Sequence, residues 1–469
     1  MLRRLFYSFT FSHLLLFYSF TLLLFYSFNF TMNRRILNIA IPSIVSNITV
    51  PLLGLVDMAI SGHMGDAVYI GAVAVGSMIF NVIYWLFGFL RMGTSGMTSQ
   101  SLGRRDLDGV AMLLMRSMGV ALLIGFTIVV LQYPIGRLAL MLTGATADIS
   151  SEAWVYFRIC VWGAPAMLCL YGLTGWYIGM QNTRLPMFIS ILQNVVNIAA
   201  SFTFVYVMGM KVEGVALGTL VAQYAGLVVS LLLWTYTYGN RLFGRICWRD
   251  VFEHSELSRF FTVNRDIFLR TLFMVAVNFY FLSAGASQGA VVLAVNTLLM
   301  QLFTLFSYVM DGFAYAGEAL CGRLYGAGNS EGFARMVRRL FMWGLGLSAV
   351  YTLVYALGGR PFLMLLTDNA SVIDASASYV PWAVFIPLCG MAAFIWDGVF
   401  IGITATRGML VSSAIASVLF FVVYLVLRPM LHNHALWIAF LMYLAMRGVV
   451  QTVLYNKWSR GKGPANKDR

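Results

Sequence analysis

Twelve apolar stretches, each long enough to cross a bilayer, recur along the 469 residues and limit what this chain can fold into. About 20 mainly apolar residues span the hydrocarbon as an α-helix, and only helices or closed barrels satisfy their backbone there. With 10% charged residues, the chain is far from the composition of a soluble domain. We predict an all-α polytopic membrane protein with twelve transmembrane helices. They lie near 36–62, 68–92, 111–133, 153–180, 186–208, 214–238, 267–286, 290–316, 333–357, 379–403, 408–428 and 434–456.

Basic residues predict the orientation of these helices. Most arginines, among them Arg104, Arg184 and Arg407, fall in connections on one side, together with the basic end of the chain. Because cytoplasmic loops are enriched in Lys and Arg, both termini are expected in the cytoplasm, as in a multi-pass protein of a bacterial inner membrane. The net charge of +13 is thereby explained without a nucleic-acid partner.

The chain reads as two related halves. The segment Gly175-Trp-Tyr-Ile-Gly179 parallels Gly398-Val-Phe-Ile-Gly402, and similar pairs keep an offset near 223 residues. Six helices is an even number, so both halves enter from the same side and are expected to be related by a pseudo-twofold axis along the membrane normal. The predicted units are an N-terminal six-helix lobe 32–238, a cytoplasmic linker 239–266, a C-terminal six-helix lobe 267–456 and a basic cytoplasmic tail 457–469.

Residues 1–31 differ from the rest of the chain. They repeat the phrase Phe-Tyr-Ser-Phe three times, with runs of leucine between the copies. Such low-complexity sequence specifies no packed core. We interpret this segment as a leader or a misassigned start, with Met32 as the ordinary beginning.

Asp57 is a carboxylate within the first apolar stretch. Ionisable residues inside membrane spans are costly and usually mark an ion or proton path. Pro42 and Pro51 each remove a backbone hydrogen bond from the same helix, so a bend that responds to protonation of Asp57 is expected. The alternative is that Asp57 only hydrogen-bonds between helices.

The second half carries three more acids in apolar stretches. Asp311 and Glu318 are two helical turns apart on one face, with Arg270 as a candidate partner. They form either a second ion site or a structural ion pair. Asp397 has no obvious cation near it in the sequence and is a further candidate for the second ion site.

Polar side chains in the fifth stretch are candidates for the substrate cleft. Asn194 and Asn197 lie three residues apart on one helical face, with Gln193 alongside. They could solvate Asp57 or a substrate, or hold helices together.

Several kinds of chemistry have no signature in the sequence. There is no GxxxxGK[ST] loop for nucleotide hydrolysis, no HExxH motif and no CxxC pair. We therefore expect no enzyme activity, no bound metal and no cofactor. If the chain transports, an ion gradient of H⁺ or Na⁺ supplies the energy.

The chain resembles the multidrug and toxic compound extrusion (MATE) family, and within it the DinF-like subfamily, from about Ile36 to Tyr455. The resemblance rests on phrases that occur in one order: Val50-Pro-Leu-Leu-Gly-Leu-Val-Asp57, Gly62-His63, Tyr69-Ile-Gly-Ala-Val-Ala74, Gly88-Phe-Leu-Arg-Met92, Asn264-Arg-Asp-Ile267, Asp311-Gly-Phe-Ala-Tyr315, Asp397-Gly-Val-Phe-Ile-Gly402 and Asn433-His-Ala-Leu-Trp437.

The resemblance implies a two-lobed antiporter that exchanges protons or sodium for bulky, often cationic or amphipathic compounds. It implies that Asp57 couples to the ion, with Asn197 and Thr219 as polar neighbours. Ser201 stands where some archaeal relatives carry a second Asp, so a scheme with two carboxylates cannot be transferred.

Two other functions stay open at this stage. A flippase for lipid-linked precursors would need a portal to the lipid and more cations in the cleft. A membrane-embedded enzyme would need a clustered nucleophile and base, which the sequence does not show. The expected partners are a small organic molecule and the bilayer, and the family resemblance implies a monomer.

Overall fold

The computed structural model describes residues 30–246, 248–251 and 253–462, and every regular element in this part of the chain is helical. Twelve helical segments are long and apolar enough to span a membrane, which confirms the predicted fold class. The first half contains α2 Phe30–Gly62, α3 Ala67–Leu86, α4 Phe89–Gly103, α5 Leu107–Val130, α6 Gln132–Thr143, α7 Ala147–Cys160, α8 Ala164–Gly179, α9 Arg184–Phe202 and α10 Val212–Trp234. After it come α11 Asn240–Leu242, α12 Trp248–Val251, α13 His254–Ala286, α14 Ala290–Gly326, α15 Ser330–Leu366, α16 Ala370–Ser376, α17 Val380–Gly402, α18 Thr406–Leu431 and α19 Asn433–Lys462.

The helices extend further than the apolar stretches suggested. The connection expected at 239–266 contains the short helices α11 and α12, and α13 begins within it at His254. The last helix continues to Lys462, into the segment expected to be a tail. The low-complexity residues 1–29 lie outside the described part of the chain.

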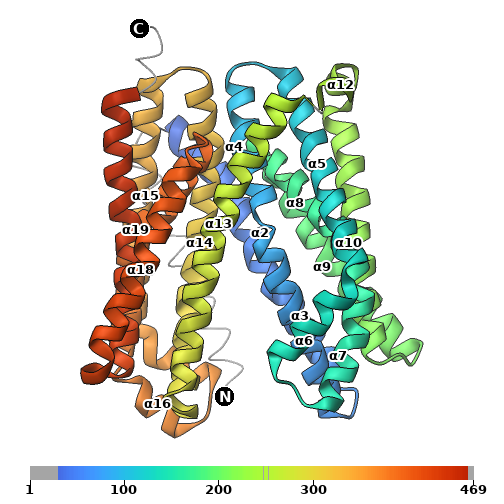
Figure 1. The fold of residues 1–469 in the computed structure, drawn as a ribbon, viewed down its shortest axis with the longest axis vertical. Helices are drawn as coiled ribbons and strands as arrows, with labels where there is room; N and C mark the ends of the chain where they lie inside the picture. Colours follow the sequence, from blue (N-terminus) through green and yellow to red (C-terminus); the bar gives the residue numbers. More distant parts are fainter. Residues whose placement is uncertain (1–29, 247, 252, 463–469) are drawn as a thin grey trace.

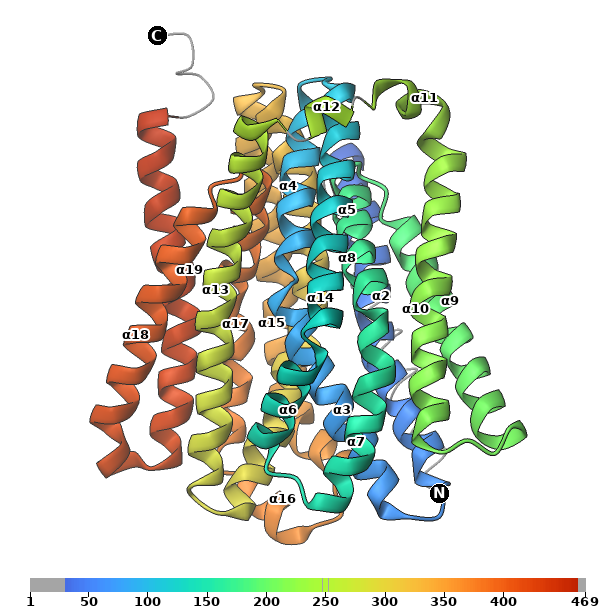
Figure 2. The ribbon, with the colours of Figure 1, turned by 45° about the vertical axis from the view of Figure 1, so that its right-hand side comes forward.

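The helices form two lobes that converge at one end and separate toward the other (Figure 1). We call the converging end the basic end, because its turns at 103–107, 179–184, 326–330 and 402–406 carry or adjoin the arginines of the connections. In the turned view α4, α8 and α14 run through the middle, with α18 and α19 on one flank and α9 and α10 on the other (Figure 2).

The first helix of each half starts against the other lobe. Ile36 and Ala40 of α2 belong to the core cluster of the C-terminal lobe, whereas the end of α2 packs in the N-terminal lobe. In the same way, Phe260 and Ile267 of α13 are buried in the core of the N-terminal lobe. Each half is therefore anchored in its neighbour by one crossing helix.

Left-handed backbone turns repeat with the offset expected from the sequence. The offset is 224 residues for the first pair and 223 for the others. The pairs are Gly65 with Gly289, Arg105 with Gly328, Gln181 with Thr404, and Gly209 with His432. A positive φ is uncommon outside glycine, so these matched positions are independent evidence that the halves share one backbone path.

The lobes meet through reciprocal contacts at the basic end. Gln100 Nε2 of α4 donates to Thr404 Oγ1 over 3.0 Å, and Arg323 Nη1 of α14 donates to Gln181 Oε1 over 2.8 Å. Residues 100 and 323 occupy equivalent positions in the two halves, as do 181 and 404. The interface thus has the self-complementary form of a twofold contact, although both sides belong to one chain.

Small residues let α4 and α14 approach closely. A Cβ at Gly103 would overlap the backbone of Arg323, and a Cβ at the equivalent Gly326 would overlap the backbone of Gln100. Close approach through small residues is a common way to pack helices in membranes, where the hydrophobic effect does not drive them together.

We expect Gly326→Leu to destabilise the protein, because overpacking a tight contact costs about 1–3 kcal/mol. The measurement is the thermal unfolding midpoint in detergent. The matched control is Gly119→Leu in α5, where a Cβ meets no atom within 4 Å. Equal midpoints for the two variants would show that the close approach of α4 and α14 adds nothing to stability.

Candidate functional site

Asp57 is buried in the N-terminal lobe, five residues before α2 ends, with 3% of its surface exposed. Its Oδ2 lies 3.4 Å from Thr219 Oγ1 of α10, which also accepts a hydrogen bond of 3.1 Å from Asn197 Nδ2 of α9. The structure thus brings together the three residues that the resemblance proposed for ion coupling, from three different helices.

The polar atoms around Asp57 are incompletely paired. Asp57 Oδ1, Asn197 Oδ1 and Ser201 Oγ are buried without a hydrogen-bond partner, and in the described chain Asp57 forms no ion pair. Buried polar atoms are normally satisfied, so unpaired ones call for an explanation. An ionised carboxylate is costly in such surroundings, and a proton or a small cation would neutralise it.

Two candidates from α9 lie away from Asp57. Asn194 Nδ2 donates over 3.0 Å to the backbone oxygen of Thr49 in α2, and Gln193 packs against Gly226 of α10. Asn194 therefore holds the middle of α2 rather than Asp57. Gln193 lies at the contact between α9 and α10.

Proline leaves a carbonyl of α2 open to another helix. Pro42 cannot donate to the carbonyl of Asn38, four residues earlier. That oxygen accepts a hydrogen bond of 3.3 Å from Thr183 Oγ1, next to the start of α9. Pro51 likewise lies inside α2, six residues before Asp57. The segment of α2 between the prolines is thus tied to α9 by side chains instead of by its own backbone alone.

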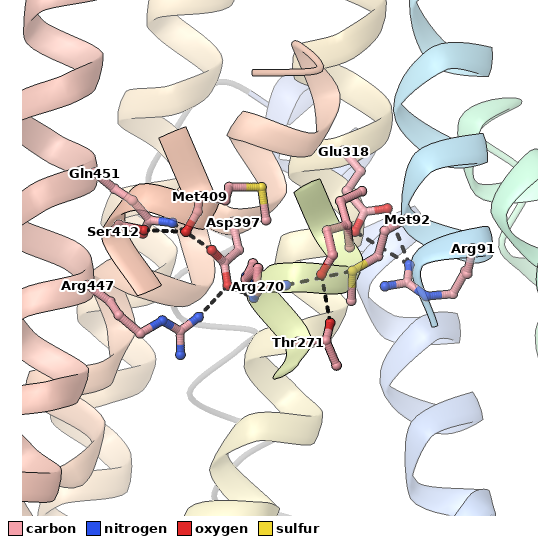
Figure 3. A network of polar contacts seen from close by, with 11 residues as sticks. Arg91, Met92, Arg270, Thr271, Glu318, Asp397, Met409, Ser412, Arg447 and Gln451 are labelled. Atoms are coloured by element: carbon pink, nitrogen blue, oxygen red, sulfur yellow. Dashed lines mark hydrogen bonds and ion pairs between the residues drawn. The ribbon is translucent and has the colours of Figure 1, made fainter. Parts of the chain in front are cut away.

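Asp397 in α17 is the centre of a buried network in the C-terminal lobe (Figure 3). Its Oδ2 accepts hydrogen bonds from Arg270 of α13 and, over 2.6 Å, from Arg447 of α19. Gln451 donates to Oδ1 over 2.6 Å. Two guanidinium groups therefore face one carboxylate, and the cluster carries one net positive charge.

Glu318 pairs across the lobes instead of with Arg270. Its carboxylate is 1% exposed and accepts a hydrogen bond of 2.6 Å from Ser95 Oγ. Arg91 Nη1 lies 3.3 Å from the same Oε2 atom. Ser95 and Arg91 both belong to α4, so every side-chain partner of this carboxylate comes from the N-terminal lobe.

The expected grouping of Asp311, Glu318 and Arg270 is therefore corrected. Arg270 serves Asp397, and Glu318 serves Arg91. Asp311 is partly exposed and makes no hydrogen bond or ion pair with the described residues. Sequence reasoning found no cation for Asp397 because Arg270 and Arg447 are brought to it by tertiary packing.

The pairing of Glu318 with Ser95 did have a sequence signal. The two positions are 223 residues apart, so they are equivalent in the two halves. Residues at equivalent positions can touch only where the pseudo-twofold axis passes between them. The repeat offset, applied to α4 and α14, could have placed Ser95 opposite Glu318.

Among the residues that the structure describes, no group of three or more His, Cys, Asp or Glu side chains could hold a metal ion. The acids of the site act singly, each in its own surroundings.

Comparison with known proteins identifies the family. The MatE family model matches residues 42–203 and 267–426, most of the chain. The chain is 35% identical to the DNA damage-inducible protein F of Escherichia coli, over 92% of this chain and 93% of that protein. It is 23% identical to the multidrug resistance protein MdtK of Edwardsiella ictaluri, over 82% and 84%.

Solved structures share the fold. A MATE protein in the bent conformation superposes with a TM-score of 0.83 at 20% identity, covering 93% of this chain and 96% of that one. A transporter of the MOP superfamily from Pyrococcus furiosus gives a TM-score of 0.81 at 20% identity, with 91% and 95% covered. With the matched family model and the full-length relative, these findings show that the chain is a transporter rather than an enzyme and belongs to the MatE family.

Proposed function

We propose that this protein is a cation-coupled antiporter that exports organic, often cationic or amphipathic, compounds by alternating access, with Asp57 as the coupling residue and the proton as the first candidate for the ion. It works as a monomer in a bacterial inner membrane, with the basic end in the cytoplasm. The names of relatives support export of multidrug type, among them the human multidrug and toxin extrusion protein 1, which is 25% identical over 74% of this chain.

The environment of Asp57 is the observation that supports this proposal most. Of the buried membrane carboxylates Asp57, Glu318 and Asp397, the last two are matched by arginines, whereas Asp57 has only uncharged neighbours. Taking up a proton there removes an uncompensated charge and adds a hydrogen-bond donor. Either change favours a different packing of α2 against α9 and α10.

The proton would reach Asp57 from the end opposite the basic end. Asp57 lies near the last turn of α2, at the end where the lobes separate (Figure 1). The inter-lobe hydrogen bonds of Gln100 and Arg323 lie at the other end. The structure thus corresponds to a state closed toward the cytoplasm, and transport requires the basic end to open in turn.

We expect Asp57→Asn to abolish ion-driven export while the protein stays folded, since asparagine cannot change its charge. The measurement is movement of a fluorescent organic cation in proteoliposomes under an imposed pH gradient or an imposed sodium gradient. Asp148→Asn is the matched control, because Asp148 is an exposed acid at the same end of the molecule.

The two gradients separate the possible outcomes. Loss of pH-driven export in the Asp57 variant alone supports proton coupling there, and a response to sodium alone assigns sodium instead. Export that still follows either gradient in Asp57→Asn rules out this residue as the coupling site. A wild-type protein that moves no dye under any gradient would favour the flippase function.

Opening of the basic end can be blocked with a disulfide. The Cβ of Ser99 lies 3.0 Å from the place where Gly322 would carry one, across the lobe interface. We expect the pair Ser99→Cys and Gly322→Cys, in a chain without its native cysteines, to stop export when oxidised and to recover with reductant. Each single cysteine serves as a control. Undiminished export by the cross-linked protein would contradict alternating access through this end.

Asp397 is expected to act in stability and not in ion coupling. Asp397→Asn leaves two buried guanidinium groups facing a neutral side chain, and breaking a buried ion pair costs about 3–5 kcal/mol. We expect a lower unfolding midpoint in detergent, with Asp368→Asn, an exposed acid of the same lobe, unchanged. A variant with normal stability and altered ion dependence would instead assign an ion site to Asp397.

A further inference from the structure

A cavity of about 780 Å³ opens at the basic end of the C-terminal lobe, away from Asp57 and from the Asp397 network. Its walls come from α13, from the turn between α17 and α18, and from the end of α19. This volume is within the range of small-molecule binding sites. Nothing in the proposed transport cycle uses it.

The cavity lies at the depth of the lipid headgroups. Arg265 precedes the far end of α13 by 21 residues, or roughly 32 Å along the helix. The hydrocarbon is about 30 Å thick, so Arg265 lies at its cytoplasmic edge when the basic end faces the cytoplasm. The positively charged group of this residue is therefore near the phosphates of the inner leaflet.

Each of the three helices around the cavity shows the same polarity gradient. A charged or amphipathic residue lies near the basic end, and a leucine follows about one turn deeper in the membrane. The pairs are Arg265 and Leu269 on α13, Arg407 and Leu410 on α18, and Trp458 and Leu454 on α19. A wall with cations at the rim and apolar residues below matches a phospholipid better than a soluble anion.

The charges at the rim favour an anion. Arg407 is exposed and has no hydrogen-bond or ion-pair partner in the described chain. Asp266, the single acid in the lining, already accepts hydrogen bonds from Arg265 over 3.2 Å and from Thr406 over 3.3 Å. The first turn of α18 also lines the cavity, and helix N-termini favour negative groups.

We propose that this cavity binds the phosphate headgroup of an anionic phospholipid, with Arg265 and Arg407 as its ligands and Trp458 at the interface. Basic pockets between membrane helices on the cytoplasmic side are a known form of lipid recognition. The site also borders the lobe interface, because Thr404 lines it and accepts the hydrogen bond from Gln100. A bound lipid would therefore pack against the turn that joins the lobes at this end.

The test is native mass spectrometry of the full-length protein with added phosphatidylglycerol or phosphatidylcholine. We expect the wild type to prefer phosphatidylglycerol, and the double variant Arg265→Gln/Arg407→Gln to bind it about tenfold more weakly or worse, since each arginine near an anionic lipid contributes to affinity. Arg184→Gln is the matched control, because Arg184 is exposed at the position equivalent to Arg407 in the other half and does not line this cavity.

A second variant guards against misfolding. Arg265→Lys/Arg407→Lys keeps the charges and is expected to keep the preference for phosphatidylglycerol. Equal binding by the wild type and the glutamine variant would overturn the proposal, as would an equal loss in Arg184→Gln. Inorganic phosphate is the remaining arm: if it binds or displaces the lipid at millimolar concentration, the site takes a soluble phosphate and the lipid assignment fails. None of these readouts depends on transport.

Discussion

The contact between α4 and α14 is the constraint on which the rest of the structure depends. These helices are equivalent in the two halves and meet through glycine and serine at the basic end. The reciprocal hydrogen bonds of Gln100 and Arg323 follow from that equivalence. Because the lobes are joined mainly along this line, they can separate at the opposite end while each keeps its own core.

The two halves share a backbone but differ in charge. The position equivalent to Asp57 is Tyr280, and the position equivalent to Asp397 is Thr174. Asp57 has uncharged partners from α9 and α10, whereas Asp397 is held by two arginines. One fold thus provides a carboxylate whose charge is uncompensated in one lobe and a saturated ionic cluster in the other. The asymmetry fits a division between ion coupling and structural support.

Much of the fold could be predicted from the sequence. The apolar stretches predicted the twelve spans, and the repeat offset predicted the relation of the halves, because both depend on local patterns of the chain. The crossing of α2 and α13 into the opposite lobes could not be predicted in this way. Ile36 and Phe260 are apolar in either location, so their sequence does not say which core they join.

The candidate site was predicted less evenly. Asp57, Asn197 and Thr219 could be placed together because they match family positions. The partners of Asp397 and Glu318 could not be found from spacing, since Arg447 and Arg91 come from helices far away in the chain. Ion pairs between helices depend on their relative rotation, which an apolar pattern specifies only coarsely.

The pair of Ser95 and Glu318 also bears on how such a chain can originate. In a dimer of two identical six-helix subunits, the same residue stands on both sides of the symmetry axis. Glutamate on both sides would press two carboxylates together, and serine on both sides would leave Arg91 without its counter-charge. This pairing is therefore available only after gene duplication and fusion, when each copy of the ancestral helix can mutate separately.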